Sequence, residues 1–331
     1  MHVCIIAEAG VNHNGDLNLA LDLCKAAKEA GADIVKFQTW KTEKIITENV
    51  AQAKYQKENT QEEDSQFEML KKLELGYDEF KKIKEYCEEI GIQFASTADE
   101  EESLEFLIKL GIPFIKIGSG DINNIPYLRY IGSKRMPVIL STGMSTIADV
   151  DLSIRALKEG GCNNITLLHC TTSYPCPYEN VNLKAMETLD NCFGYPVGYS
   201  DHTMGQEVAV AAVARGATVI EKHFTLDRSL PGPDHIASTE PHEFSEMVKA
   251  IRNIEMALGN GKKEPTHEEQ EISEVVLKRI VASKNISDGE TLNINNICVK
   301  RNETGISAKY WDMIVGTKAK RAYVKDEAIE L

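Results

Sequence analysis

Residues 3–38 read VCIIAEAGVNHNGDLNLALDLCKAAKEAGADIVKFQ, in which two short apolar runs enclose a segment with helical periodicity. Asp16 is a candidate N-cap, and Gly31 provides a stop before the second run. The segment is therefore predicted to form a strand, a helix and a second, parallel strand. The apolar stripe of this helix comprises Leu17, Ala20, Leu21, Cys24 and Ala27.

The same alternation of strand-like and helical patterns continues to about residue 258. Helical patterns at 145–160, which starts at a Ser, and at 241–258 repeat the start and stop signals of the first unit. About eight parallel strands close a barrel, so we predict a (β/α)₈ TIM barrel over residues 1–258. The strand candidates are residues 3–9, 33–38, 92–97, 113–118, 137–142, 165–170, 196–201 and 218–224.

Two segments fall outside this repeat. Residues 40–76 are polar and longer than a loop between a strand and a helix requires, so they form either a lid over the barrel mouth or a surface excursion. Residues 259–275 are a predicted polar linker. Residues 276–331 contain short strand-like pieces separated by glycines and are predicted to form a separate small domain.

Composition limits the classes of partner. The 331 residues carry a formal net charge of −14, which disfavours nucleic acid and anionic membrane surfaces as partners. No signal peptide or membrane span is readable, so a cytoplasmic location is expected. The 8 cysteines lack C-x-x-C spacing and are expected to be reduced thiols. An anionic substrate would need a local cationic pocket in so acidic a chain.

Polar residues stand at the end of nearly every predicted strand, where barrel enzymes carry their active sites. Side chains two apart on a strand share a face, so pairs such as Lys36/Gln38 can point together into the barrel. Any one of these residues can instead be a hydrogen-bonded core or rim group, and the joint pattern argues for a site. The residues are Glu8, Lys36, Gln38, Thr97, Lys116, Ser119, Ser141, His169, Ser200, His202, Glu221 and His223.

His202 and His223 end the last two predicted strands, which are adjacent in a barrel. Two imidazoles there can hold one divalent ion and leave positions for water and substrate, although histidines also serve as hydrogen-bond partners or general bases. Glu221 can orient the surroundings of the ion or pair with Lys116.

Lys36 and Lys116, with nearby hydroxyl groups, would suit a phosphate and a carboxylate. The competing chemistry is a Schiff-base aldolase that uses Lys36 or Lys116, and borohydride trapping with a keto acid would separate the two. The hydroxyl groups belong to Thr97, Ser119, Ser141 and Ser200.

Several strings of residues resemble the sialic acid (nonulosonic acid) synthase family, which includes N-acetylneuraminate and N,N'-diacetyllegionaminate synthases. The resemblance runs in order over essentially the whole chain, and the joint match is highly specific. The strings are AEAGVNHNG (7–15), VKFQT (35–39), KIGSGDINN (116–124), STGM (141–144), LLHCTTSYPCP (167–177), GYSDHT (198–203), EKHFT (221–225), GPDH (232–235) and VKR (299–301).

The resemblance implies a TIM barrel followed by a small C-terminal antifreeze-like (SAF) domain at 276–331, in a domain-swapped homodimer. It implies an enzyme that condenses phosphoenolpyruvate (PEP), water and an N-acylated amino sugar into a nine-carbon acid, with phosphate released by C–O cleavage. The sugar would be N-acetylmannosamine or 2,4-diacetamido-2,4,6-trideoxymannose. A divalent ion, usually manganese, would lie on His202 and His223.

Residue roles follow from the same resemblance. Glu8, Asp121 and Glu221 would join Lys36 and Lys116 as catalytic residues. Arg301 would reach the sugar from the neighbouring chain. The residues matched to PEP binding are Lys36, Thr97, Lys116, Ser119, Ser141, Thr172 and Ser200, and those matched to sugar binding are Gln38, Tyr174, Asp234 and Arg301.

The chain departs from the family pattern at four places. Position 121 is Asp where Glu is common, and Thr172 stands where some members have Asn. Ala98-Asp99 stands where Pro-Phe is frequent, which would alter the loop after the third strand. Val275 or Leu277 falls where some relatives place an aromatic residue over the sugar.

A non-catalytic alternative is a protein whose C-terminal domain binds ice or glycan while the barrel is a scaffold. The ring of polar residues at the strand ends argues against it. A phosphate-release assay distinguishes the two. Another alternative is the same chemistry on a different aldehyde.

Overall fold

The computed structural model describes residues 2–53, 56–57, 59 and 64–330. The chain divides into two compact units, Met1–Gly259 and Asn260–Leu331. The first unit ends one residue after residue 258, where the sequence pattern placed the end of the barrel. The two units are described separately below.

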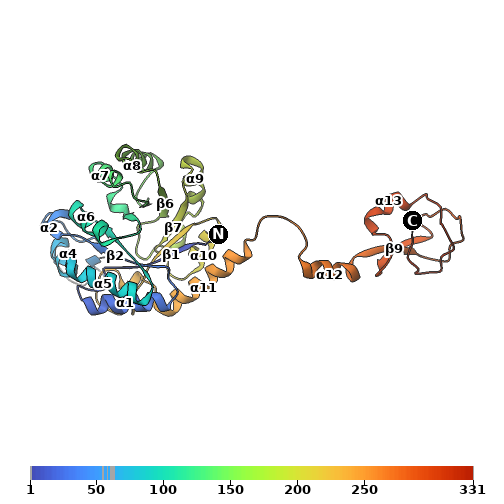
Figure 1. Ribbon diagram of the computed structural model, residues 1–331, viewed down its shortest axis with the longest axis horizontal. Helices are drawn as coiled ribbons and strands as arrows, with labels where there is room; N and C mark the ends of the chain where they lie inside the picture. The colour runs from blue at the N-terminus through green and yellow to red at the C-terminus, as the bar shows by residue number, and fades with distance from the viewer. Residues whose placement is uncertain (1, 54–55, 58, 60–63, 331) are drawn as a thin grey trace. The chain divides into compact units, whose positions relative to one another are not determined.

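The first unit is a closed barrel of eight parallel strands in sequential order (Figure 1). Each strand predicted from the sequence is present to within two residues at either end, so the predicted (β/α)₈ fold is confirmed. The strands are β1 (Cys4–Gly10), β2 (Ile34–Thr39), β3 (Gln93–Ala98), β4 (Ile115–Ile117), β5 (Val138–Ser141), β6 (Ile165–Cys170), β7 (Val197–Asp201) and β8 (Val219–His223).

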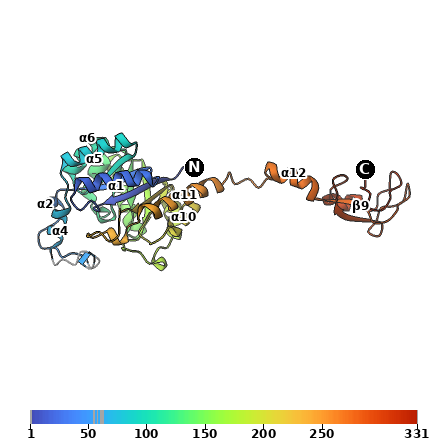
Figure 2. The same cartoon turned by 90° about the horizontal axis from the view of Figure 1, so that it is seen from below.

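Helices surround the barrel, and α1, α5 and α6 lie side by side along one part of it (Figure 2). The helices are α1 (Leu17–Glu29), α2 (Thr42–Ile45), α4 (Gln66–Leu73), α5 (Tyr77–Ile90), α6 (Glu101–Leu110), α7 (Ile125–Ser133), α8 (Ile147–Gly160), α9 (Lys184–Phe193), α10 (Glu207–Ala214) and α11 (Pro241–Ala257), with 3₁₀ turns η1 (Ser119–Asp121), η2 (Tyr178–Asn180) and η3 (His235–Ala237).

Helix caps follow local chemistry. Asp16 caps α1 as predicted, and its carboxylate accepts a hydrogen bond of 2.7 Å from the Asn18 backbone N–H. The predicted start of α8 at Ser145 is shifted, because Thr146 is the cap and forms a reciprocal capping box with Asp149.

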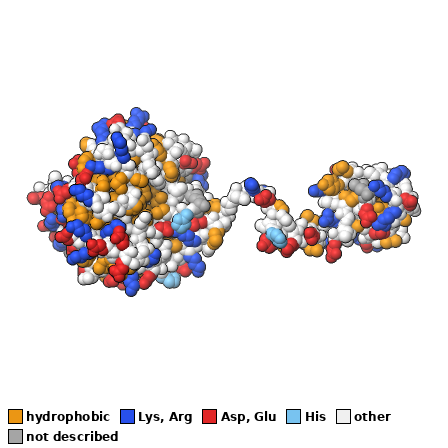
Figure 3. Space-filling view, in the orientation of Figure 1, with side chains coloured by type: hydrophobic (Ala, Val, Ile, Leu, Met, Phe, Trp, Pro, Cys, Tyr) orange, Lys and Arg blue, Asp and Glu red, His pale blue; other side chains and the backbone are white. Residues whose placement is uncertain are grey.

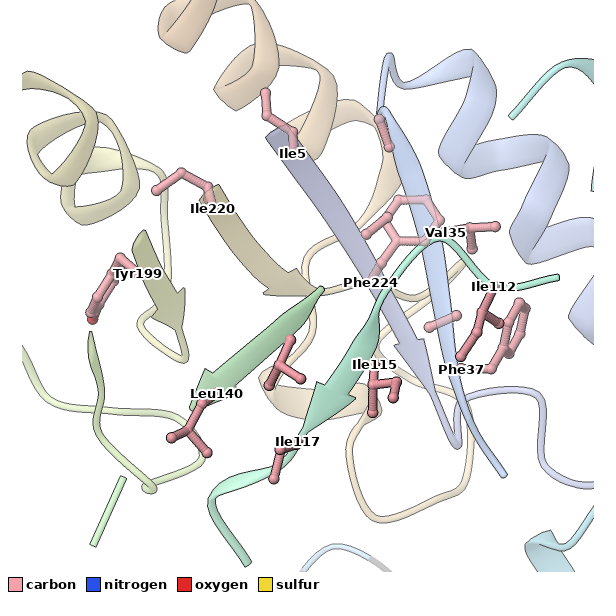
Figure 4. Packing of buried hydrophobic residues seen from close by; sticks show 14 of the residues in the cluster. Ile5, Val35, Phe37, Ile112, Ile115, Ile117, Leu140, Tyr199, Ile220 and Phe224 are labelled. Atoms are coloured by element: carbon pink, nitrogen blue, oxygen red, sulfur yellow. The ribbon is translucent and has the colours of Figure 1, made fainter. Parts of the chain in front are cut away.

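The strands have two different faces. Outward side chains such as Ile5, Val35, Ile115, Leu140 and Ile220 belong to the main hydrophobic core between the barrel and its helices (Figure 4). Inward side chains near the start of the strands form a second apolar cluster, which we call the lower layer. It fills the barrel interior and so makes the barrel a packed core. The lower layer comprises Ile6, Ile34, Ala95, Phe114, Ile139, Leu168 and Val219.

Gly198 occupies the equivalent place on β7, and only glycine fits there. A Cβ atom would come within 2.6 Å of Leu168 Cδ2 and 2.4 Å of the Val219 carbonyl oxygen. The close packing of the lower layer therefore depends on the absence of a side chain at this position.

The two segments outside the repeat contain local structure. The predicted lid, residues 40–76, includes α2 and α4, while residues 54–55, 58 and 60–63 of it lie outside the described residues. The predicted linker is partly helical, since α12 (His267–Val276) begins at a capping box between Thr266 and Glu269. The capping signal T-x-x-E explains why a helix starts within this polar linker.

The second unit has its own small core. Strands β9 (Lys278–Ala282) and β10 (Ile297–Arg301) pair antiparallel, and η4 (Ala308–Tyr310) and α13 (Trp311–Ile314) follow them. Its identity as an antifreeze-like domain stays a prediction from the resemblance. The core residues are Ile280, Ala282, Ile286, Leu292, Ile297, Ile314, Ala319, Tyr323 and Ile329.

On the face drawn in Figure 3, acidic and basic side chains are interspersed over the barrel unit. Within the described part of the chain, no helix combines the length and the apolar character needed to cross a bilayer.

Candidate active site

The upper part of the barrel interior is polar. The residues two positions after each member of the lower layer, and after Gly198 on β7, point into the same barrel, and they line a cavity of about 460 Å³ at the C-terminal ends of the strands. We call these residues the upper layer. They are Glu8, Lys36, Thr97, Lys116, Ser141, Cys170, Ser200 and Glu221.

Glu221 connects the two lysines of the upper layer. Its carboxylate lies 3.7 Å from Lys36 Nζ and 3.4 Å from Lys116 Nζ, and Ser200 Oγ donates a hydrogen bond of 3.2 Å to it. Burial raises the pKa of Glu221, but the ammonium groups of Lys116 and Lys36 outweigh burial and lower the pKa to about 2. Glu221 is therefore an anion that holds two cations at the centre of the cavity.

Lys36 is the more strongly paired lysine. Its Nζ lies 2.6 Å from Glu8 Oε2 and donates to Thr97 Oγ1 at 3.0 Å, while Gln38 Nε2 donates to Glu8 Oε1 at 2.9 Å. Burial lowers the pKa of Lys36, but Glu221 and Glu8 outweigh burial and raise it. Burial raises the pKa of Glu8 despite the neighbouring Lys36. This network fixes one ammonium group at the wall of the cavity.

Lys116 has weaker anionic support. It donates to Ser141 Oγ at 2.8 Å and to the Ile117 carbonyl oxygen at 3.2 Å. Burial lowers its pKa, and the single carboxylate of Glu221 does not compensate. An anionic ligand beside Lys116 would favour its charged form.

His202 and His223 lie together at the ends of β7 and β8, with ring centroids 5.3 Å apart. His202 Nδ1 donates to the Thr171 carbonyl oxygen at 2.8 Å, so the lone pair of the neutral ring is on Nε2. Burial and the neighbouring His202 keep the pKa of His223 well below its usual range, and its buried Nδ1 has no hydrogen-bond partner among the described residues.

This arrangement fits a divalent ion in part. The separation of the rings allows both to contact one ion, and the carbonyl behind His202 is the type of outer partner that orients a ligating histidine. Within the described ranges, no group of three or more His, Cys, Asp or Glu side chains is gathered as a metal site. An ion on these two residues would thus be completed by water and substrate.

Two residues matched to the sugar lie beside the histidines. The Tyr174 ring centroid is 4.2 Å from that of His202, and Asp234 Oδ2 is 3.8 Å from His223 Nδ1. Burial raises the pKa of Asp234 to about 6. Asp234 lines a smaller cavity of about 190 Å³, which it shares with Gln38, Tyr174 and His223.

Four further residues complete the predicted set. Ser119 Oγ accepts a hydrogen bond of 3.0 Å from the Gly143 N–H and lines the large cavity, as does Thr172. Asp121 is outside the lining of this cavity, and its carboxylate accepts a hydrogen bond of 3.0 Å from Asn124. Arg301 ends β10 in the second unit and is exposed.

His169, predicted as a polar strand end, points to the outside of β6. Its Nε2 bonds the Val181 carbonyl oxygen at 2.7 Å, and it lines a separate cavity of about 620 Å³ beside α8 and α9. That cavity is larger, but it lacks the lysines and carboxylates that converge in the upper layer. We therefore assign the chemistry to the cavity of about 460 Å³ that the upper layer lines.

Sequence reasoning missed several residues of the cavity. Cys170 completes the upper layer on β6, where the period of two along the strand identifies it once Leu168 is known to point inward. Gln56 and Gln66, from the segment 40–76, and Asp99, directly after β3, also line it. A lone residue after a strand gives no signal of its direction, so Asp99 was noted only as a departure from the family pattern.

Comparison with known proteins identifies the family. Residues 23–263 match the model of the NeuB family. The chain is 47% identical over 318 residues to N,N'-diacetyllegionaminic acid synthase of Legionella pneumophila, covering 95% of this chain and 89% of that protein. It is 45% identical to N,N'-diacetyllegionaminic acid synthase of Campylobacter jejuni, covering 98% of each chain.

A solved structure agrees with these relatives. The crystal structure of N-acetylneuraminic acid (sialic acid) synthetase from Leptospira borgpetersenii, in complex with citrate, superimposes with a TM-score of 0.74 at 38% identity. The match covers 83% of this chain and 91% of that one. The chain belongs to the NeuB family, so the resemblance to the sialic acid synthases is confirmed.

Proposed function

We propose that this chain condenses phosphoenolpyruvate with an N-acylated amino-sugar aldehyde and water to make a nine-carbon nonulosonic acid and phosphate. The observation that carries the proposal is the upper layer itself. Two buried lysines face one cavity, and hydroxyl groups and two histidines surround them. The two ammonium groups supply the local positive charge that a small trianion needs in a chain with a net charge of −14.

The phosphate and carboxylate of PEP would bind to Lys36 and Lys116 and to nearby hydroxyl groups. Glu221 keeps the two ammonium groups apart at fixed positions, since it lies within 3.7 Å of both. A bound trianion would add negative charge beside Lys116 and so raise the pKa that burial lowers. The hydroxyl groups belong to Thr97, Ser119, Ser141, Thr172 and Ser200.

The open-chain sugar would bind at Gln38, Tyr174 and Asp234, with its aldehyde toward His202 and His223. Lewis-acid polarisation of the aldehyde oxygen is the chemistry that a divalent ion, manganese in our proposal, would supply there. Because the rings of His202 and His223 are 5.3 Å apart, both can serve one ion. The domain-swapped homodimer, with Arg301 of one chain near the sugar of the other, is part of the same proposal.

Bond formation would join carbon 3 of PEP to the aldehyde carbon. Water then adds at carbon 2, and Glu8 takes its proton. We prefer Glu8 to Asp121 because Glu8 lines the cavity and burial raises its pKa, whereas Asp121 lies outside the lining. The proton passes to the alkoxide oxygen formed from the aldehyde. The hydroxyl group at carbon 2 then becomes the keto group and gives its proton to the phosphate, which leaves with the bridging oxygen as its bond to carbon 2 breaks.

For the sugar, we propose 2,4-diacetamido-2,4,6-trideoxymannose before N-acetylmannosamine. The two relatives with 47% and 45% identity are N,N'-diacetyllegionaminic acid synthases. A comparison of turnover with the two sugars tests this choice.

The reaction is tested with PEP that carries oxygen-18 in the bridging position. We expect the label in the released phosphate, and its retention in the nine-carbon product would reject C–O cleavage. Chelation should stop turnover and manganese should restore it. As a readout independent of activity, electron paramagnetic resonance should show Mn²⁺ bound to the wild type and weak binding to His202→Ala.

A Schiff-base aldolase is the second candidate, favoured by the lowered pKa of Lys116. The pairing of Lys36 with Glu8 at 2.6 Å makes Lys36 the poorer nucleophile. Borohydride with pyruvate should leave the mass of the protein unchanged, whereas a covalent adduct on Lys116 would favour the aldolase.

A further inference from the structure

Asp99 differs from the other acidic residues of the cavity. It follows β3 directly, and its backbone N–H donates a hydrogen bond of 3.2 Å to the Thr39 carbonyl oxygen, which keeps it beside the end of β2. Its side chain is partly buried and lines the same cavity as Glu8 and Gln38.

Within the part of the chain that the structure describes, the Asp99 carboxyl has no hydrogen-bond or ion-pair partner. Glu8, by contrast, is held by Lys36 and Gln38, Glu221 by two lysines and Ser200, and Asp121 by Asn124. Because the Asp99 side chain is only partly buried and faces the cavity, its carboxyl oxygens can accept a hydrogen bond from a ligand there.

The negative charge of the Asp99 carboxylate determines whether PEP or the sugar can donate the hydrogen bond to it. A carboxylate repels the phosphate and carboxylate of PEP, whereas a sugar offers O–H and N–H donors. The pairing of β2 with β3 places Gln38 opposite Thr97, two residues before Asp99, and Gln38 lines both the main cavity and the sugar side.

We infer that Asp99 binds the amino-sugar substrate by accepting a hydrogen bond from a hydroxyl or amide N–H group of the sugar. This inference rests on the proposed condensation. Burial and the neighbouring Asp121 raise the pKa of Asp99 to about 7, so the acceptor is ionised most fully above neutrality.

The experiment compares steady-state kinetics of the wild type and Asp99→Asn at pH 8, with both sugars and with PEP. We expect the KM for the sugar to rise about tenfold or more, the usual effect of losing a hydrogen bond to a charged group, while the KM for PEP changes less than about twofold. Asp99→Glu should restore part of the loss. Glu101→Gln removes an exposed carboxyl two residues away and should match the wild type.

The two sugars identify the donor. N-acetylmannosamine has hydroxyl groups at carbons 4 and 6, and the diacetamido sugar has an N–H at carbon 4 and a methyl group at carbon 6. A rise in KM for both sugars places the donor at carbon 4 or on a group that they share, and a rise for N-acetylmannosamine alone places it at carbon 6.

An unchanged sugar KM in Asp99→Asn, with normal wild-type turnover, would overturn this inference and leave the proposed function standing. A rise in the KM for PEP as large as that for the sugar would also overturn it. A wild type that releases no phosphate with either sugar would instead reject the proposed function and the inference with it. Circular dichroism and the melting temperature check the fold, and Asp99→Ser serves as a second variant.

Discussion

The barrel interior contains two layers that the same strands build two residues apart. The lower layer is apolar on each strand that contributes to it, and the upper layer carries two lysines, two glutamates, three hydroxyl groups and a thiol. Each lower residue has its counterpart above, as Ile34 has Lys36 and Phe114 has Lys116. The lower layer stabilises the barrel by burying apolar side chains, whereas the upper layer holds buried charged groups, whose burial is unfavourable, in position to bind a ligand.

The first prediction concerns a buried ion pair outside the cavity, which we expect to stabilise the fold. Lys222 and Asp201 form a buried ion pair of 2.6 Å on the outward face of β7 and β8. Lys222→Met should lower the free energy of unfolding by about 3–5 kcal/mol, because it leaves an unpaired buried carboxylate. Urea unfolding measures this loss. Lys249→Met, at an exposed pair, should change stability by less than about 0.5 kcal/mol.

The second test removes a charge of the upper layer. Lys116→Met should lower the rate of phosphate release from PEP by about 10²–10³-fold, since it removes a fixed cation from the reacting anion. Its melting temperature should stay near that of the wild type, because burial disfavours the Lys116 ammonium group and Glu221 keeps Lys36 and Ser200 as partners. Lys109→Met, on the exposed side of α6, is the matched control. A large loss of stability would mean that Lys116 belongs to the core.

The third test removes volume from the lower layer. Leu168 is fully buried there, and Leu168→Ala should cost about 3 kcal/mol in unfolding free energy. The KM for PEP should stay the same, since Cys170 and not Leu168 lines the cavity. Leu152→Ala, at a side chain that is 55% exposed, should cost less than about 0.5 kcal/mol. An equal loss in both variants would contradict the layer model.

The smallest expected effect is the pH dependence of stability at Asp99. Its folded-state pKa is about 7 against a usual 3.8, so the folded protein keeps a proton that the unfolded chain releases. The wild type therefore loses stability as pH rises through this window. The groups that act on Asp99 are Asp121, Lys36, Glu8 and Glu100.

Asp99→Asn removes this dependence. Its advantage in melting temperature over the wild type should grow between about pH 4 and pH 7 and then level off. Differential scanning calorimetry across this range measures the advantage. A constant difference at every pH would show that Asp99 ionises normally in the folded chain.

The sequence was sufficient for the barrel and for most of the upper layer. Apolar residues that recur every two positions identified the strands, and those that recur every 3.6 positions identified the helices. The alternation of side chains along β2, β7 and β8 predicted that Lys36, His202 and His223 point into the same cavity, and they do. The sequence did not predict that the polar linker at 259–275 contains a helix, which starts at the capping box at Thr266. His169 faces outward, since it is one residue out of step with Leu168 and Cys170.

The positions of the Asp121 and Asp99 side chains depend on tertiary contacts, which the periodicity of the sequence does not predict. Asp121 lies outside the cavity because η1 turns its carboxyl to Asn124. Asp99 lines the cavity because its backbone N–H donates a hydrogen bond to the Thr39 carbonyl oxygen at the end of the neighbouring strand β2. Both residues follow the ends of strands, where the alternation that predicts side-chain direction stops.

The most direct test of the whole account measures phosphate released by the purified wild type from PEP in the presence of Mn²⁺, with and without the amino sugars. The account predicts release only when PEP and a sugar are both present, with equal formation of a nine-carbon keto acid. Phosphate release from PEP alone, or no release with either sugar, would contradict it.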